Sequence, residues 1–201
     1  MKWKLKDILM IAIVGVLFSF LFLGANELGV MLTAALTPAG YGPLGYQIIY
    51  GAWFMAATFA TYIIQKAGVG ILAEIIAAAL ETMMGSMFGP SAILSGLIQG
   101  VGCELGFLVT AYKKFNTFTM ILSSVFCSVI SFIFEYYRFG YGVNTKQMLV
   151  LMLLCRTISS VLLTGIASKL LADQLANAGV LRGYKLGIKQ SIKKNETKGA
   201  A

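Results

Sequence analysis

Long apolar runs separated by short polar segments make up most of this 201-residue sequence. Each run approaches the roughly 20 residues that an α-helix needs to cross the hydrocarbon core of a bilayer. We therefore predict an all-α integral membrane protein with six transmembrane helices, at residues 8–23, 46–64, 69–84, 91–112, 118–137 and 147–171.

The connections between these runs are short, with one exception. Residues 24–45 carry no Lys or Arg and contain the turn-forming residues Pro38, Gly40, Gly42 and Pro43. We expect a long external loop here, which is a candidate lid over a binding site.

The positions of the cations predict how the helices are oriented. If the N-terminus lies in the cytoplasm, only Arg138 and Lys146 lie outside and the other cations lie inside. The prediction is a six-helix domain at residues 1–175 with both ends in the cytoplasm, followed by a basic cytoplasmic tail at residues 176–201. This tail either lies on the anionic inner leaflet or is a solvated tail, and the sequence favours neither.

Composition narrows the classes of function. With 58% hydrophobic and 12% charged residues, the chain has no room for a soluble catalytic or nucleotide-binding domain, and it contains no GxxxxGK[ST] phosphate loop. The net charge of +8 lies at the chain ends and between the runs, so it does not suggest nucleic acid. His is absent and the cysteines are scattered, so we expect no metal, no cofactor and no catalytic residue.

Ionisable residues at membrane depth are candidate functional residues, because a charge in lipid is costly unless it is paired or faces water. Glu74 and Glu81 are seven residues apart and share one helical face. Arg156 lies near the predicted midplane and needs a carboxylate partner, for which Glu74 or Glu104 has the matching depth. Glu135, beside Arg138, is expected to form a pair at the membrane interface.

Polar and aromatic residues gather in the outer half of the predicted bundle. Tyr46, Tyr50 and Trp53 follow helical spacing, and Gln47 lies one turn from Tyr50. Gln99 lies at mid-depth among glycines, which permit either close helix packing or a cavity. A pocket of carboxylate, amide and aromatic groups suits a small cation with a flat ring.

Three segments carry a resemblance to a known family. They read YGAWFMA at residues 50–56, AEIIAAALE at residues 73–81 and SGLIQGVGCELGF at residues 95–107. The chain resembles, over about residues 2–175, the substrate-binding S components of energy-coupling factor (ECF) transporters, specifically the YkoE type.

The resemblance implies a protein of the bacterial plasma membrane that binds thiamine or its hydroxymethylpyrimidine precursor. It also implies a transmembrane T subunit and two cytoplasmic ATPase subunits as partners. A small-residue face on the first span, here Ala12, Gly15 and Ser19, would pack on the T subunit. The expected substrate-binding residues are Glu81, Gln99, Tyr50, Trp53, Gln47, Glu74 and Glu104.

Two other classes of function remain open on the sequence. A membrane-embedded enzyme would use Glu81 and Glu104 as acid and base, although no nucleophile stands near them. A structural or assembly protein would use its Gly-rich spans for oligomerisation, with its carboxylates satisfied by Arg156. Saturable uptake of a vitamin, or recovery of a stoichiometric ligand from the purified protein, would exclude the structural class.

Overall fold

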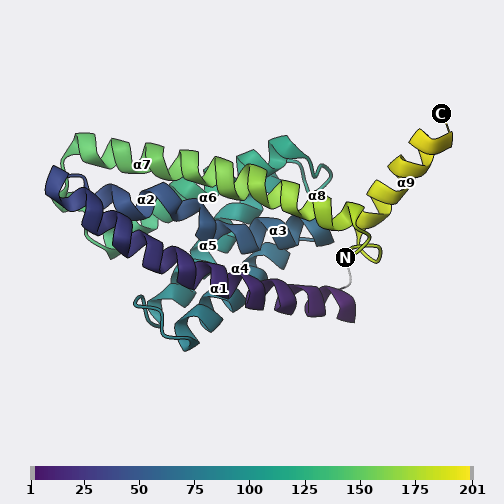
Figure 1. The fold of residues 1–201 in the computed structure, drawn as a ribbon, viewed down its shortest axis with the longest axis horizontal. Coiled ribbons are helices and arrows are strands. Elements are labelled where there is room, and N and C mark those ends of the chain that lie inside the picture. Colours follow the sequence, from purple (N-terminus) through teal and green to yellow (C-terminus); the bar gives the residue numbers. More distant parts are fainter. Residues whose placement is uncertain (1–2, 200–201) are drawn as a thin grey trace.

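The structure is a computed structural model that describes residues 3–199, with side-chain surroundings for residues 3–192. Every regular element in this part of the chain is helical (Figure 1). The main elements are α1 (Leu5–Leu36), α2 (Gly45–Ile49), η3 (Tyr50–Phe54), α3 (Met55–Ile64), α4 (Val69–Met83), α5 (Ser91–Leu108), α6 (Thr117–Arg138), α7 (Lys146–Ser160), η5 (Val161–Ala167), α8 (Ser168–Asn177) and α9 (Lys185–Gly199). Three short 3₁₀ turns join them: η1 (Thr37–Ala39), η2 (Gly42–Leu44) and η4 (Tyr141–Val143).

Five helical segments of the described chain are long and apolar enough to cross a membrane: Leu5–Ala39, Gly42–Ile64, Ser91–Leu108, Thr117–Arg138 and Lys146–Asn177. The third predicted span corresponds to α4, whose 15 residues are shorter than these five segments. The all-helical membrane bundle that the apolar runs predict is confirmed.

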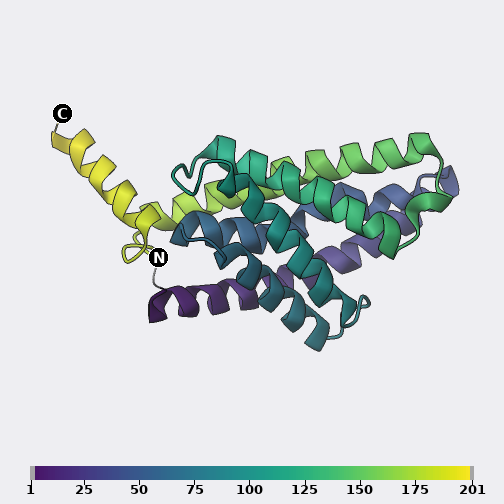
Figure 2. The same ribbon diagram turned by 180° about the vertical axis from the view of Figure 1, so that it is seen from behind.

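The helices form one bundle in which α1 and the α7–α8 rod run along the full length (Figure 1). α5 packs against both α4 and α6, and α1 packs against α4 (Figure 2). The N-terminal end meets the start of the tail, where the Tyr184 hydroxyl donates to the Lys6 carbonyl at 2.7 Å. Leu181 and Leu186 are buried in the core, so the first part of the tail, including the start of α9, packs on the bundle, while the rest of α9 projects from it (Figure 1).

The predicted long loop at residues 24–45 is wrong for most of its length. α1 continues without interruption to Leu36, and the connection to α2 contains only η1 and η2. Helix formers such as Leu28, Met31 and Leu36 carry the helix past Gly24, because an isolated glycine costs only about 1 kcal/mol in a helix. The turns predicted at Pro38 and Pro43 are present, since each proline is the second residue of a 3₁₀ turn.

Two predicted helices contain irregular segments that face each other. The second span changes from α-helix to 3₁₀-helix over η3, and the last span contains the π-helix η5. η3 contacts both η5 and the end of α7, and a Cβ added at Gly51 would lie 2.4 Å from the carbonyl oxygen of Ser159 in α7. Only a glycine permits this approach of two backbones.

The glycines of α5 serve helix packing. A Cβ added at Gly102 or Gly106 would meet the α6 backbone at Cys127 or Ser123, and one added at Gly100 would meet the α4 backbone at Ile71. Small residues allow such close contact between membrane helices. Of the two sequence interpretations for these glycines, the structure supports close packing.

The small-residue face expected on the first span lies partly inside the molecule. Gly15 packs against Ile76 of α4 and Ser19 is buried, whereas Ala12 is exposed. The three residues therefore do not form one free surface on this subunit. The 3.6-residue period of α1 turns two of them toward α4.

Candidate functional site

A cavity lies between α1, the second span, α4, α5 and α6. Four of the residues predicted from the sequence line it together: Tyr50 and Trp53 from η3, Glu81 from α4 and Gln99 from α5. The complete lining is Phe22, Tyr46, Tyr50, Trp53, Ala78, Glu81, Phe88, Ala92, Ser95, Gln99, Glu135 and Phe139.

Glu81 is the carboxylate on the α4 wall of this cavity. It lies in the last turn of α4, and its Oε1 accepts a hydrogen bond of 3.0 Å from the Ser86 hydroxyl. The Trp53 side chain is also within hydrogen-bonding range of Glu81. None of the ion pairs between described side chains includes Glu81, so its charge is not matched by a neighbouring cation.

Aromatic side chains enclose the carboxylate. The ring centroids of Tyr46 and Trp53 are 6.1 Å apart, those of Tyr46 and Phe88 are 5.8 Å apart, and those of Trp53 and Phe88 are 6.3 Å apart. Phe88 belongs to the α4–α5 turn, between Gly85 and Gly89, both with positive φ. An aromatic box around a carboxylate is suited to a flat organic cation, through ion pairing and cation–π contact.

A wider chamber adjoins the cavity and shares Tyr46, Tyr50, Phe88, Glu135 and Phe139 with it. Its empty space is about 1260 Å³, including the open volume at its mouth. Thr33, Thr37, Gly40 and other residues of the α1–α2 connection line it, as does Gln47, the fifth predicted residue. The predicted lid region thus borders the chamber as helix end and 3₁₀ turns.

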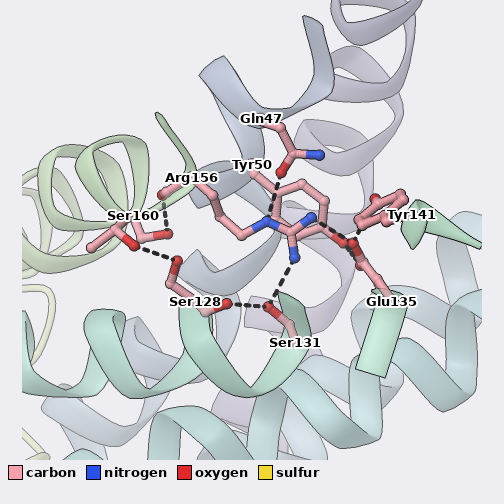
Figure 3. A network of polar contacts seen from close by, with 9 residues as sticks. Gln47, Tyr50, Ser128, Ser131, Glu135, Tyr141, Arg156 and Ser160 are labelled. Atoms are coloured by element: carbon pink, nitrogen blue, oxygen red, sulfur yellow. Dashed lines mark hydrogen bonds and ion pairs between the residues drawn. The ribbon is translucent and has the colours of Figure 1, made fainter. Parts of the chain in front are cut away.

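Arg156 is the centre of a buried polar network beneath Tyr50 (Figure 3). Its Nη2 contacts Glu135 Oε2 at 2.5 Å, its Nε donates to Gln47 Oε1 at 2.7 Å and its Nη1 donates to the Ser131 hydroxyl at 3.3 Å. The carboxylate partner is therefore Glu135, and the predicted pairing with Glu74 or Glu104 is wrong. Both members of the pair are almost completely buried.

Glu135 is also not the interfacial residue that its position near Arg138 predicted. It accepts hydrogen bonds from the Tyr50 and Tyr141 hydroxyls as well as from Arg156, so its oxygens are fully engaged (Figure 3). Burial, followed by the Glu135 carboxylate, raises the pKa of Tyr141, which keeps this phenol a hydrogen-bond donor. The charges of Glu135 and Arg156 offset each other, which leaves Glu81 as the carboxyl group at the cavity without a cation partner among the described side chains.

Glu74 and Glu104, the remaining predicted residues, line neither the cavity nor the wider chamber. Glu104 Oε1 accepts from the Gly70 amide at 2.7 Å, at the first turn of α4, and its other oxygen accepts from the Tyr112 hydroxyl. Glu74 Oε2 accepts from the Ala57 amide at 2.8 Å. Both carboxyl groups thus contact helix starts.

The partner of Arg156 and two aromatic residues of the turns, Phe88 and Phe139, were not predicted from the sequence. One available signal was the polar stripe Ser124, Ser128, Ser131 and Glu135, whose helical spacing places it on one buried face of α6. Phe88 and Phe139 carried no comparable signal, because they lie in turns whose course is set by tertiary contacts.

Comparison with known proteins gives three matches. A family model described as the permease component of an ABC-type cobalt transport system matches residues 6–130. A Bacillus subtilis (strain 168) protein named "Putative HMP/thiamine permease protein YkoE" is 36% identical over 186 residues, which are 92% of this chain and 91% of the relative. A solved structure described as an S-component of an ECF transporter superposes with a TM-score of 0.94 at 34% identity, covering 100% of this chain and 99% of the other.

The family match spans more than half of the chain, and both relatives align over nearly all of it. The fold, the multi-pass membrane location and the enclosed cavity agree with this relationship. The chain therefore belongs to the S components of ECF transporters, which are membrane-embedded substrate-binding subunits, not enzymes, and act with an energy-coupling module.

Proposed function

We propose that this S component captures thiamine or its hydroxymethylpyrimidine precursor from the extracellular side, with Glu81 as the central ligand contact. The observation that carries the proposal is the Glu81 carboxyl group, which has no cation partner among the described side chains and lines a cavity with aromatic walls. Thiamine has a cationic ring and an aminopyrimidine, which suit cation–π contact and paired hydrogen bonds. The name of the B. subtilis relative supports the same ligand class.

Tyr50 and Trp53 provide the ring contacts in this proposal, and Gln99 provides an amide for the ligand's polar edge. Gln47 acts from the wider chamber, where its side-chain oxygen is already held by Arg156. An aromatic lining of this kind favours an organic ring over a bare metal ion, although the matching family description names cobalt. Glu74 and Glu104 lie outside the cavity and make no ligand contact in this proposal.

The proposed topology has six spans, counting the short α4, with both chain ends in the cytoplasm. The membrane domain ends at about residue 175, and residues 176–201 form the cytoplasmic tail. A T subunit and two cytoplasmic ATPases supply the energy for uptake, because this chain contains no phosphate-binding loop. Substrate enters through the wider chamber, whose lining includes the α1–α2 connection.

Calorimetric titration of the purified protein with thiamine and with hydroxymethylpyrimidine tests the proposal. Wild type should bind at least one of them saturably, and Glu81→Gln should weaken thiamine binding more than tenfold, because it removes the unmatched charge and keeps the shape. Asp7→Asn is the matched control, because Asp7 is also buried but pairs with Lys66 away from the cavity.

The outcomes separate the ligand from the residue. Folded wild type that binds neither compound would refute the ligand assignment and revive the structural class. Tight binding that is unchanged in Glu81→Gln would support the ligand assignment and show that Glu81 is not a ligand contact. Equal losses in Glu81→Gln and Asp7→Asn would point to general destabilisation.

A further inference from the structure

The second span reaches the cavity through a stretch of irregular backbone. η3 carries Tyr50 and Trp53, and α3 begins immediately after it at Met55. Backbone groups that leave the regular helical pattern at membrane depth need other partners, because no water competes for them there. Side chains of neighbouring helices supply these partners.

Three neighbours hold this stretch. Ser159 Oγ accepts from the Gly51 amide at 3.0 Å, and the Thr164 hydroxyl donates to the Gly51 carbonyl at 2.6 Å. On the other side, Glu74 Oε2 accepts from the Ala57 amide at 2.8 Å. Ala57 lies in the first turn of α3, where the backbone passes from 3₁₀-helix to α-helix. Glu74 is thus a cap donated by another helix.

Glu74 has no charge partner at this position. It is 0% exposed, and none of the ion pairs between described side chains includes it. Its titratable neighbours are Glu81 on its own helix, Cys103 on α5 and Cys127 on α6, none of which supplies a positive charge. Its Oε1 has no hydrogen-bond partner among the described residues.

An isolated buried carboxylate costs several kcal/mol, and the protonated acid avoids this cost. We propose that Glu74 is a neutral carboxylic acid whose carbonyl oxygen caps α3 and thereby positions Tyr50 and Trp53 at the cavity. Glu74 is a positioning residue and does not touch the ligand. Its role in ligand affinity rests on the proposed function, whereas its protonation state does not.

Infrared difference spectroscopy tests the protonation state without any ligand. Wild type minus Glu74→Gln at neutral pH should show the carbonyl stretch of a protonated carboxylic acid, with a shift in deuterated buffer. Asp7→Asn is the control, because Asp7 pairs with Lys66 and its difference spectrum should show carboxylate bands. Carboxylate bands in the Glu74 difference spectrum would overturn the proposal.

Affinity for the bound compound tests the positioning role. Glu74→Gln keeps a neutral acceptor for the Ala57 amide and should bind within about twofold of wild type. Glu74→Leu leaves that amide unsatisfied and should weaken binding about tenfold. Glu104→Leu, which removes the equivalent cap at Gly70, should lower stability and leave affinity within about twofold.

These experiments distinguish a failure of the proposed function from a failure of the role assigned to Glu74. If wild type binds neither thiamine nor hydroxymethylpyrimidine, the proposed function fails and the infrared result still decides the state of Glu74. Equal affinity losses in Glu74→Gln and Glu74→Leu, or equal losses in Glu74→Leu and Glu104→Leu, would overturn the positioning role. Should Glu74→Leu not fold, a tenfold loss of affinity in Glu74→Gln would still overturn the role of Glu74 as a neutral cap.

Discussion

The guanidinium carbon of Arg156 lies 3.6 Å from the centroid of the Tyr50 ring, and the Tyr50 hydroxyl donates to Glu135, the carboxylate partner of Arg156. One aromatic residue therefore contacts both members of a buried ion pair while it also lines the cavity. The position of Tyr50 depends on the integrity of this pair.

Breaking the pair from one side should be costly. Arg156→Met leaves Glu135 as a buried carboxylate without its cation, which typically costs about 3–5 kcal/mol. In detergent, the unfolding temperature of this variant should be clearly lower than that of wild type. It should recover in part in the double variant Arg156→Met/Glu135→Gln. Arg138→Met, at an exposed position beside Phe139, is the control and should unfold like wild type. Wild-type stability of Arg156→Met would contradict the importance of the pair.

The close approach of η3 to the end of α7 should not tolerate a methyl group. In Gly51→Ala the new Cβ would lie 2.4 Å from the Ser159 carbonyl oxygen and 2.8 Å from the Ser160 Cα, both of which are backbone atoms. Relief requires the two segments to separate, at a typical cost of about 1–3 kcal/mol. Thermal unfolding measures the loss.

Gly24→Ala provides the comparison for that substitution. Gly24 is exposed in α1 and its added Cβ would meet nothing within 4 Å. Alanine is the better helix former, so this variant should be neutral or slightly stabilised. Equal behaviour of the two variants would show that the close approach at Gly51 is unimportant.

Tyr141 should give the protein a specific response to alkaline pH. Its pKa is raised above the ordinary value of 10.0, first by burial and then by Glu135. Because the folded-state pKa is the higher one, its stabilising contribution is complete below about pH 10 and is lost as the pH rises through the folded value. Tyr141→Phe should lose about 1 kcal/mol at pH 8, and the gap from wild type should narrow above pH 10.

Unfolding temperatures at pH 8 and at higher pH measure this gap. Tyr137→Phe is the control, because Tyr137 is 81% exposed and its hydroxyl makes no hydrogen bond with the described residues. A gap that stays constant across the pH range would mean that Tyr141 contributes packing alone.

The start of the tail should behave as part of the membrane domain. Leu181 is 1% exposed and lies in the same core cluster as Phe18 and Phe59. Leu181→Ala should cost about 2–5 kcal/mol, as truncations of buried leucine do. Val180→Ala, at 66% exposure, should stay within about 0.5 kcal/mol of wild type. If both variants match wild type, the tail is independent of the bundle.

The apolar runs were sufficient to predict the helical membrane fold, because a helix that crosses lipid must be apolar over a length set by the bilayer. They could not locate the end of α1, since residues 24–36 combine turn formers with good helix formers and tertiary packing decides between them. Nor could they reveal η3, because its Gly51 forms hydrogen bonds with Ser159 and Thr164 from a distant part of the chain.

Four of the predicted site residues line one cavity because each follows a rule that acts within a single helix. Tyr50, Trp53, Glu81 and Gln99 stood out as polar or aromatic residues at membrane depth. The partner of Arg156 depends instead on how helices rotate about their axes, which depth alone does not determine. For that reason Glu135, at the end of α6, was assigned to the interface rather than to Arg156.

The unequal lengths of the helices have a consequence for the surrounding lipid. At about 1.5 Å per residue, the 15 residues of α4 span roughly 22 Å, while the 32 residues of α1 span roughly 48 Å. If α4 crosses the bilayer, as the proposed topology requires, a hydrocarbon layer of about 30 Å must thin beside α4, whereas α1 must tilt within that layer. The annulus of lipid around this subunit is therefore uneven, and bilayer thickness becomes a physical variable that favours some orientations of the protein over others.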